Sequence, residues 1–121
     1  MLFRSQQLVV EMLRFHGLRV SVFADAETAW PEFLAGGHDL VLTDIVLAGR
    51  LSGLQLIKNI RRLEGPRGDT PILAMTAFED TARRLELFRA GVNYYVPKPL
   101  VRQEFIARIG NLLQADRLKA R

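Results

Sequence analysis

The chain contains no cysteine, and this absence excludes several kinds of site at once. Without thiols there is no disulfide framework, no cysteine nucleophile and no thiolate metal site. Long apolar runs are also absent, because no stretch approaches the length that a membrane-spanning helix needs. Residues 1–10 lack the charged, apolar and small-residue order of a secretory signal. We therefore expect a cytoplasmic protein with no membrane association.

The composition that is present is typical of one small globular domain. The 121 residues are 49% hydrophobic and 25% charged, which suits a single core. Lys and Arg number 17 against 13 Asp and Glu, so the net charge is +4. Such an excess can attract nucleic acid or an acidic partner. Because the basic residues are scattered along the chain, we expect a solvated basic surface and no direct binding of nucleic acid.

Hydrophobic spacing predicts an alternation of helices and strands. Helical periodicity marks five segments: 5–16, 27–34, 54–62, 80–90 and 102–118. Alternating or continuous apolar runs mark four strands: 19–24, 39–44, 71–76 and 93–97. Within the second helix, Pro31 is expected in the first turn, where its missing N–H costs nothing. This alternation with short connections predicts an α/β fold, a doubly wound parallel sheet with helices on both faces.

Three polar side chains follow apolar strands, at the sheet edge where open α/β folds carry their chemistry. They are Asp44 after VLT, Thr76 after LAM and Lys98 after YVP. A carboxylate, a hydroxyl and an ammonium that converge on one patch could accept a phosphoryl group. The carboxylate would attack phosphorus, and the other two groups would bind the phosphate oxygens. Each residue alone has a simpler explanation (a cap, a strand end, an ion pair), so the prediction rests on the three together.

At these residues the chain resembles the receiver domain of bacterial two-component response regulators. The matching stretches are DLVLTDIVLAGRLSGLQLIKNIR, TPILAMTA, RAGVNYYVPKPL and EFIARIGNLL. The resemblance implies the flavodoxin-like receiver fold and transfer of a phosphoryl group to Asp44 from a histidine kinase or phosphotransfer protein. It implies that Thr76 and Lys98 occupy the hydroxyl and lysine positions, that Tyr95 is the aromatic switch, and that the Lys98–Pro99 bond is cis. Such a domain is a phosphoacceptor in a phosphorelay and not an enzyme with a separate substrate.

The resemblance also implies a magnesium site, and here the chain departs from the family. Receivers begin with a strand that ends in paired acids, whereas residues 1–10 hold no acid. The ligands that the resemblance still implies are Asp44 and the backbone carbonyl of Val46. Because a hard divalent cation usually needs more than one carboxylate, we expect weak or absent magnesium binding and impaired phosphorylation. The alternative is a phosphorylation-independent pseudo-receiver that serves as an interaction or dimerisation module.

The missing strand also affects the expected sheet, since the family's strand order is 2-1-3-4-5 and the first strand is central. Its loss would leave a gap of about 10 Å, two strand spacings of ~4.8 Å. We expect either that 19–24 shifts to pair with 39–44 or that a second copy of the chain closes the edges. The receiver is expected over 1–116, with 117–121 as a C-terminal stub or linker and an output domain or effector left unspecified. The resemblance places partner docking on the face formed by the fourth helix, the last strand and the last helix.

Overall fold

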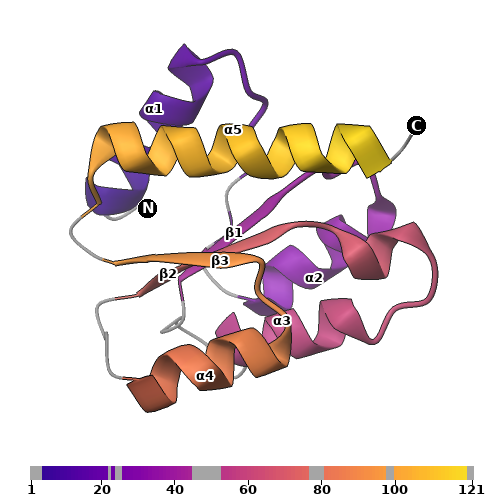
Figure 1. The fold of residues 1–121 in the computed structure, drawn as a ribbon. Coiled ribbons are helices and arrows are strands. Elements are labelled where there is room, and N and C mark those ends of the chain that lie inside the picture. Colours follow the sequence, from indigo (N-terminus) through magenta and orange to yellow (C-terminus); the bar gives the residue numbers. More distant parts are fainter. Residues whose placement is uncertain are drawn as a thin grey trace.

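Three short parallel strands form the centre of the structure (Figure 1), a computed structural model. The structure describes residues 4–21, 23, 26–44, 53–76, 81–97 and 100–119. The strands are β1 (Val41–Asp44), β2 (Ile72–Thr76) and β3 (Tyr94–Pro97), and they lie side by side in that order. Val41 pairs with Ile72, and Leu73 pairs with Tyr94, so β2 is the central strand of the described sheet.

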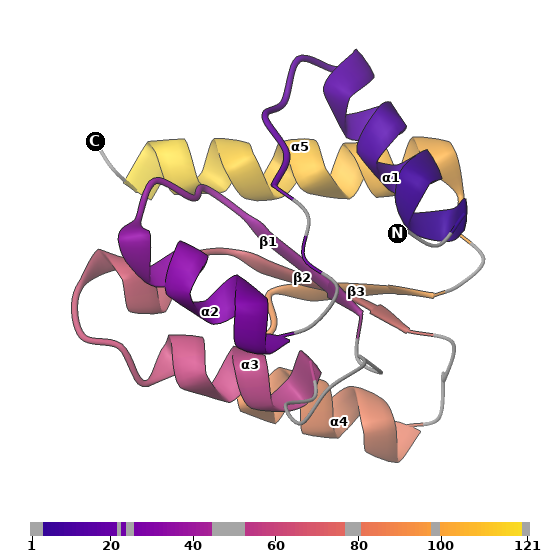
Figure 2. The same cartoon turned by 180° about the vertical axis from the view of Figure 1, so that it is seen from behind.

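Helices cover both faces of this sheet, as the sequence predicted. They are α1 (Arg4–Phe15), α2 (Ala26–Ala35), α3 (Gly53–Arg61), α4 (Thr81–Ala90) and α5 (Arg102–Lys119), with a short 3-10 helix η1 (Pro66–Asp69) before β2. Figures 1 and 2 show α1 and α5 on one face and α2, α3 and α4 on the other. The doubly wound α/β architecture is therefore confirmed. The domain boundary at residue 116 stays a prediction, and α5 continues to Lys119.

The core has two halves, one on each face of β2. Ile72, Leu73 and Ala74 are fully buried, and their side chains alternate between the halves. One half joins β2 to α2, α3 and α4 through nine buried side chains: Phe33, Leu56, Ile57, Ile60, Ile72, Ala74, Leu87, Ala90 and Val92. The other joins it to α1, β3 and α5 through Leu13, Leu73, Val96, Phe105 and Ile109. Continuous apolar runs such as β2 are typical of strands covered on both faces.

The described residues of the segment 19–24, which are 19–21 and 23, do not form the strand that the sequence predicted. Residues 18–21 and 23 form no regular element and pair with no described strand. The proposed shift of this segment to pair with β1 is therefore wrong as well. Alternation of apolar residues favours a strand only where a neighbouring strand offers hydrogen bonds, and in the family's strand order this segment pairs only with the first strand. Leu18 and Val20 instead pack as loop residues against the α1–α5 half of the core.

Pro31 also lies deeper in its helix than the sequence predicted. Because α2 begins at Ala26, Pro31 is its sixth residue and lies beyond the first turn. A proline there removes one i→i−4 hydrogen bond and crowds the preceding turn. The helix is held in place by Phe33, which is buried, and by the ring of Trp30, stacked 6.1 Å from that of Phe33. Packing therefore overrides the local preference.

None of the described helices combines the length and the apolar character needed to span a bilayer.

Candidate functional site

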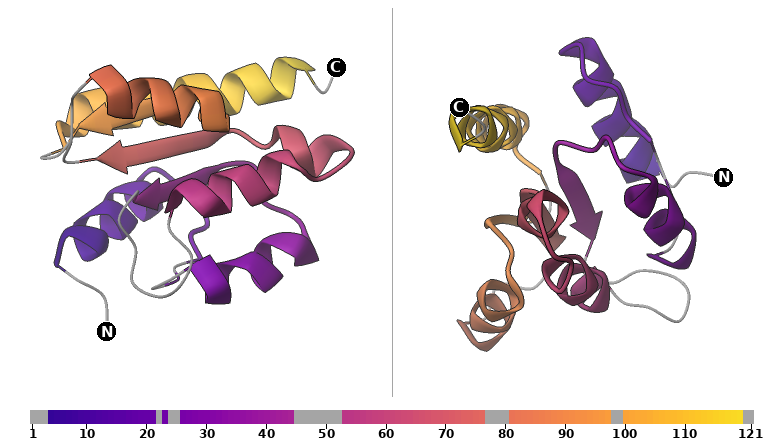
Figure 3. Two further views of the ribbon diagram at one scale, coloured as in Figure 1. Left: turned by 90° about the horizontal axis from the view of Figure 1, so that it is seen from below. Right: turned by 90° about the vertical axis from the view of Figure 1, so that its right-hand side faces the viewer.

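The carboxyl ends of the three strands meet at one edge of the sheet and bring two of the predicted site residues close together in the fold. The strands run in the same direction, which the left panel of Figure 3 shows for the arrows of β2 and β3. Asp44 is the last residue of β1 and pairs with Met75; Thr76 is the last residue of β2 and pairs with Pro97. Asp44 and Thr76 thus end neighbouring strands at this edge, and their roles in a shared site stay predictions.

Burial differs between these two residues in a way that matters for chemistry. Asp44 is half-buried, so its carboxylate keeps access to solvent. Thr76 is only 1% exposed, which fixes its hydroxyl within the end of the sheet. The backbone at Asp44 is held locally, because the Thr43 hydroxyl donates a hydrogen bond to the Asp44 carbonyl at 2.9 Å. An accessible nucleophile beside a fixed hydroxyl suits transfer of a group from outside the protein.

Three predicted features lie outside the described residues. These are the amine of Lys98, the cis bond between Lys98 and Pro99, and the backbone carbonyl of Val46. The described strand β3 ends at Pro97, directly before Lys98. The end of β3 thus lies at the carboxyl edge of the sheet, and Lys98 is the next residue in the sequence.

Tyr95, the predicted switch residue, lies on β3 against α4. Its half-buried ring lies 5.9 Å from that of Phe88 in an edge-to-face arrangement, and the Arg84 guanidinium lies 5.8 Å from its centre. The ring of Tyr94 is stacked on it at 5.9 Å, and Arg108 of α5 lies 4.1 Å from the centre of the Tyr94 ring. The two tyrosines therefore join α4, β3 and α5 into one surface, which we call the α4–β3–α5 face. Part of it is apolar and accessible, since Leu85 is 49% and Phe88 45% exposed.

A second polar centre lies at the opposite end of the strands, and the sequence did not reveal it. Arg61, the last residue of α3, donates hydrogen bonds to four acceptors: the carbonyls of Gly68, Thr70 and Gly91, and Oδ1 of Asn93, at 2.7–2.9 Å. The same Asn93 oxygen accepts a hydrogen bond from the amide of Ile72 at 2.8 Å. Burial lowers the pKa of Arg61, while the charge of Asp69 acts in the other direction. No sequence signal marks this centre, because carbonyl acceptors have no side-chain identity.

The described acids do not form a magnesium site. In the part of the chain that the structure describes, no three acidic or histidine side chains lie together in a way that could hold a metal ion. At the carboxyl ends of the described strands, the acidic residue is Asp44, which ends β1. Of the two magnesium ligands that the sequence analysis named, Asp44 is described and Val46 lies outside the described residues.

Comparison with known proteins gives the family. Residues 4–110 match the model of the response regulator receiver domain. The chain is 33% identical over 103 residues to the sensory transduction protein RegX3 of Mycolicibacterium smegmatis, which covers 85% of this chain and 43% of that protein. It is 36% identical over 105 residues to the transcriptional activator protein PfeR of Pseudomonas aeruginosa, covering 87% of this chain and 33% of that protein. The chain thus spans less than half the length of these curated relatives.

A solved structure agrees with this result. The receiver domain of the sensor histidine kinase PA1611 from Pseudomonas aeruginosa, with magnesium coordinated in its active-site cleft, superposes with a TM-score of 0.80. The identity is 31%, and the match covers 91% of this chain and 88% of that one. Such domains are signalling modules that work with histidine kinases or phosphotransfer proteins. The chain belongs to the response regulator receiver domain family.

Proposed function

We propose that this chain accepts a phosphoryl group on Asp44 from a phosphohistidine of a kinase or phosphotransfer protein. The observation that supports this most directly is the position of a half-buried Asp44 and a buried Thr76 at the ends of adjacent parallel strands. The family match over residues 4–110 supports the same chemistry. Asp39 lies just before the other end of β1 and is exposed, so it is remote from the carboxyl ends of the strands.

The proposed step is a direct transfer between nucleophiles. A carboxylate oxygen of Asp44 attacks the phosphorus, so that an O–P bond forms as the P–N bond of the donor breaks. The electron pair returns to the imidazole, which then takes up a proton from solvent. The Thr76 hydroxyl would donate to a phosphate oxygen, and the Lys98 ammonium would neutralise charge on the transferred group.

We further propose that magnesium binds this chain more weakly than it binds the family's usual site. The described donors at the sheet edge supply too few carboxylates for a hard cation. Calorimetric titration with magnesium chloride is expected to show no saturable binding below the millimolar range. Tight binding would contradict this proposal without affecting the assignment of Asp44.

Intact-mass measurement after incubation with a small phosphodonor tests the phosphoacceptor. We expect slow addition of one phosphoryl group to the chain and none to Asp44→Asn. The matched control is Asp39→Asn, which removes an exposed acid just before β1 and should leave the modification unchanged. Modification that survives in Asp44→Asn would overturn the proposal.

A second candidate is a pseudo-receiver that acts through contacts alone, and the exposed apolar part of the α4–β3–α5 face favours it. Under this function two copies would associate through Leu85 and Phe88, with no need for phosphate. Sedimentation should then show weaker association for Phe88→Ser, whereas Phe15→Ser should have no effect although Phe15 is 78% exposed on α1. Association that depends on modified Asp44 would instead support the phosphoacceptor with signalling through this face.

A further inference from the structure

A basic depression lies between α3 and α4, away from the edge that carries Asp44. Its volume is about 340 Å³, and it is open to solvent. Seven residues line it: Lys58, Arg61, Arg62, Ala82, Glu86, Arg89 and Ala90. Four of these described residues are cations and one is an acid, so together they carry three more positive charges than negative ones. This local excess of three charges is close to the net charge of the whole chain, which is +4.

Helical spacing explains why these charges gather. Lys58 and Arg61 lie three positions apart on one face of α3, and Arg62 follows directly after the helix, with its amide donating to the Lys58 carbonyl at 3.2 Å. Glu86 and Arg89, three positions apart, share a face of α4. Lys58, Arg62 and Arg89 are exposed, so their charged groups can adjust to a ligand.

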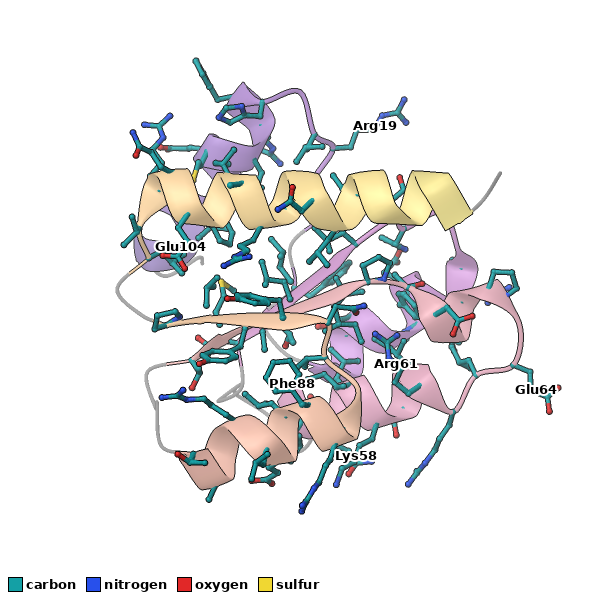
Figure 4. The ribbon with its side chains drawn as sticks, in the orientation of Figure 1. Arg19, Lys58, Arg61, Glu64, Phe88 and Glu104 are labelled. Carbon is teal, nitrogen blue, oxygen red and sulfur yellow. The ribbon has the colours of Figure 1, made fainter. Side chains whose placement is uncertain are left out.

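Arg61 differs from the other three cations because it is held rigidly. Its four described hydrogen-bond acceptors, on Gly68, Thr70, Gly91 and Asn93, are all neutral. A guanidinium has five N–H groups, so one N–H on Nη2 is left over after these bonds. Burial lowers the pKa of Arg61 and the charge of Asp69 opposes this only in part, so an added anion would stabilise the charged form. Figure 4 shows Lys58 and Arg61 on the α3–α4 side of the sheet.

We propose that this basic depression binds a phosphate chain, either inorganic polyphosphate or the triphosphate tail of a nucleotide. Arginine forks match phosphate geometry, and several phosphates in a row would meet the exposed cations on both helices together. Among the described lining residues there is no aromatic side chain on which a base could stack. The proposed site therefore recognises the phosphate groups of its ligand. The acceptors of Arg61 lie at the amino ends of β2 and β3, so the Arg61 part of this site lies at the opposite end of the strands from Asp44.

Calorimetric titration of the 121-residue chain with sodium tripolyphosphate at low ionic strength tests the proposal. We expect saturable binding that weakens as salt is added. The double variant Lys58→Gln/Arg62→Gln should lose affinity by about tenfold or more, because two charge-assisted contacts are removed. The control Arg14→Gln/Arg19→Gln removes the same charge from exposed positions on α1 and the following loop, and should bind like the parent. An equal loss in both variants, or no binding by the parent, would overturn the proposal.

Three further arms identify the ligand class. Glu86→Gln should bind tripolyphosphate more tightly, because it removes the one acid among the described lining residues. A nucleoside triphosphate should bind as tightly as tripolyphosphate if the phosphate chain alone is recognised; a much tighter nucleotide would identify the nucleotide as the source. A peptide of six glutamates that binds as tightly as tripolyphosphate would show instead that the surface takes acidic protein segments, and phosphate recognition would be rejected.

Discussion

Arg61 is a residue on which several of the described polar contacts converge. Its guanidinium connects the end of α3 to the segments that lead into β2 and β3. Replacing it removes four hydrogen bonds and leaves three carbonyls and an amide oxygen without this donor. The contacts come from positions seven, nine, thirty and thirty-two residues away in sequence, so their loss should loosen several elements together.

We expect Arg61→Met to lower the free energy of unfolding by about 3 kcal/mol, since hydrogen bonds to charged groups contribute about 1.5–3 kcal/mol each and part of this is regained from water. The neighbouring Arg62 is exposed, so Arg62→Met should change stability by no more than about 0.5 kcal/mol. Urea denaturation of both variants measures the difference. Similar midpoints for the two variants would show that the Arg61 contacts contribute little.

Replacement of Gly68 and of Gly110 by alanine should change the stability of the fold in opposite directions. A Cβ on Gly68 would overlap the carbonyl oxygen of Leu63, which is backbone and cannot move aside cheaply. On Gly110, within α5, a Cβ would meet nothing within 4 Å. Gly68→Ala should therefore destabilise the fold by about 2 kcal/mol or more. Gly110→Ala should stabilise it by up to about 1 kcal/mol, because alanine is the better helix former.

Thermal unfolding of the two alanine variants separates these effects. The melting temperature should decrease for Gly68→Ala and increase for Gly110→Ala. A decrease of the same size for both would show that the close approach of Leu63 to Gly68 is not what requires glycine there.

At the scale of elements, α2 has an internal weakness. Pro31 is exposed and lies at the sixth position of the helix, where it removes a backbone hydrogen bond. Pro31→Ala should raise the free energy of unfolding by about 2 kcal/mol, less than the full helix-interior penalty of about 3 kcal/mol because proline also restricts the unfolded chain. The control is Glu32→Ala at the next exposed position, where no gain is expected. A destabilised Pro31→Ala would mean that the ring itself packs usefully.

Most elements could be predicted from local pattern, and α5 and β2 show why. The helical spacing of α5 continues over many turns, and β2 is an unbroken apolar run of the length of a strand. The prediction of a strand at 19–24 was wrong for the described residues, because alternation reports only local preference, whereas a strand also requires a neighbouring strand to pair with. The prediction that Pro31 lies in the first turn of its helix was wrong for a related reason, because it took no account of the packing of Phe33.

The site was predictable to the same extent. Asp44 and Thr76 follow apolar strands, and the rule that parallel strands place chemistry at their carboxyl ends brought them together. The Arg61 centre was not predictable, because its partners are mainly backbone carbonyls distant in sequence. The basic depression required the relative position of α3 and α4, which no periodicity specifies.

At the scale of the whole molecule, the described sheet is asymmetric. β2 pairs on both sides, whereas β1 and β3 each pair on one side among the described residues. Hydrogen exchange should therefore be slowest at the amides of β2 and at least about tenfold faster at those of β1 that face away from β2. Backbone NMR measures this directly. Equal protection of β1 and β2 would indicate that a further strand, for example from a second copy, covers the outer side of β1.

The order of the strands has a consequence for how the chain folds during synthesis. Each strand pairs with the next one along the chain, so Val41 meets Ile72 and Leu73 meets Tyr94 across separations of only 31 and 21 residues. Such pairings close short loops and form early. Helix α1 differs, because Leu13 shares its cluster with Phe105 and Ile109 near the other end of the chain. Helix α1 therefore leaves the ribosome well before α5, and the part of its apolar face that packs with Phe105 and Ile109 stays uncovered until α5 has been made.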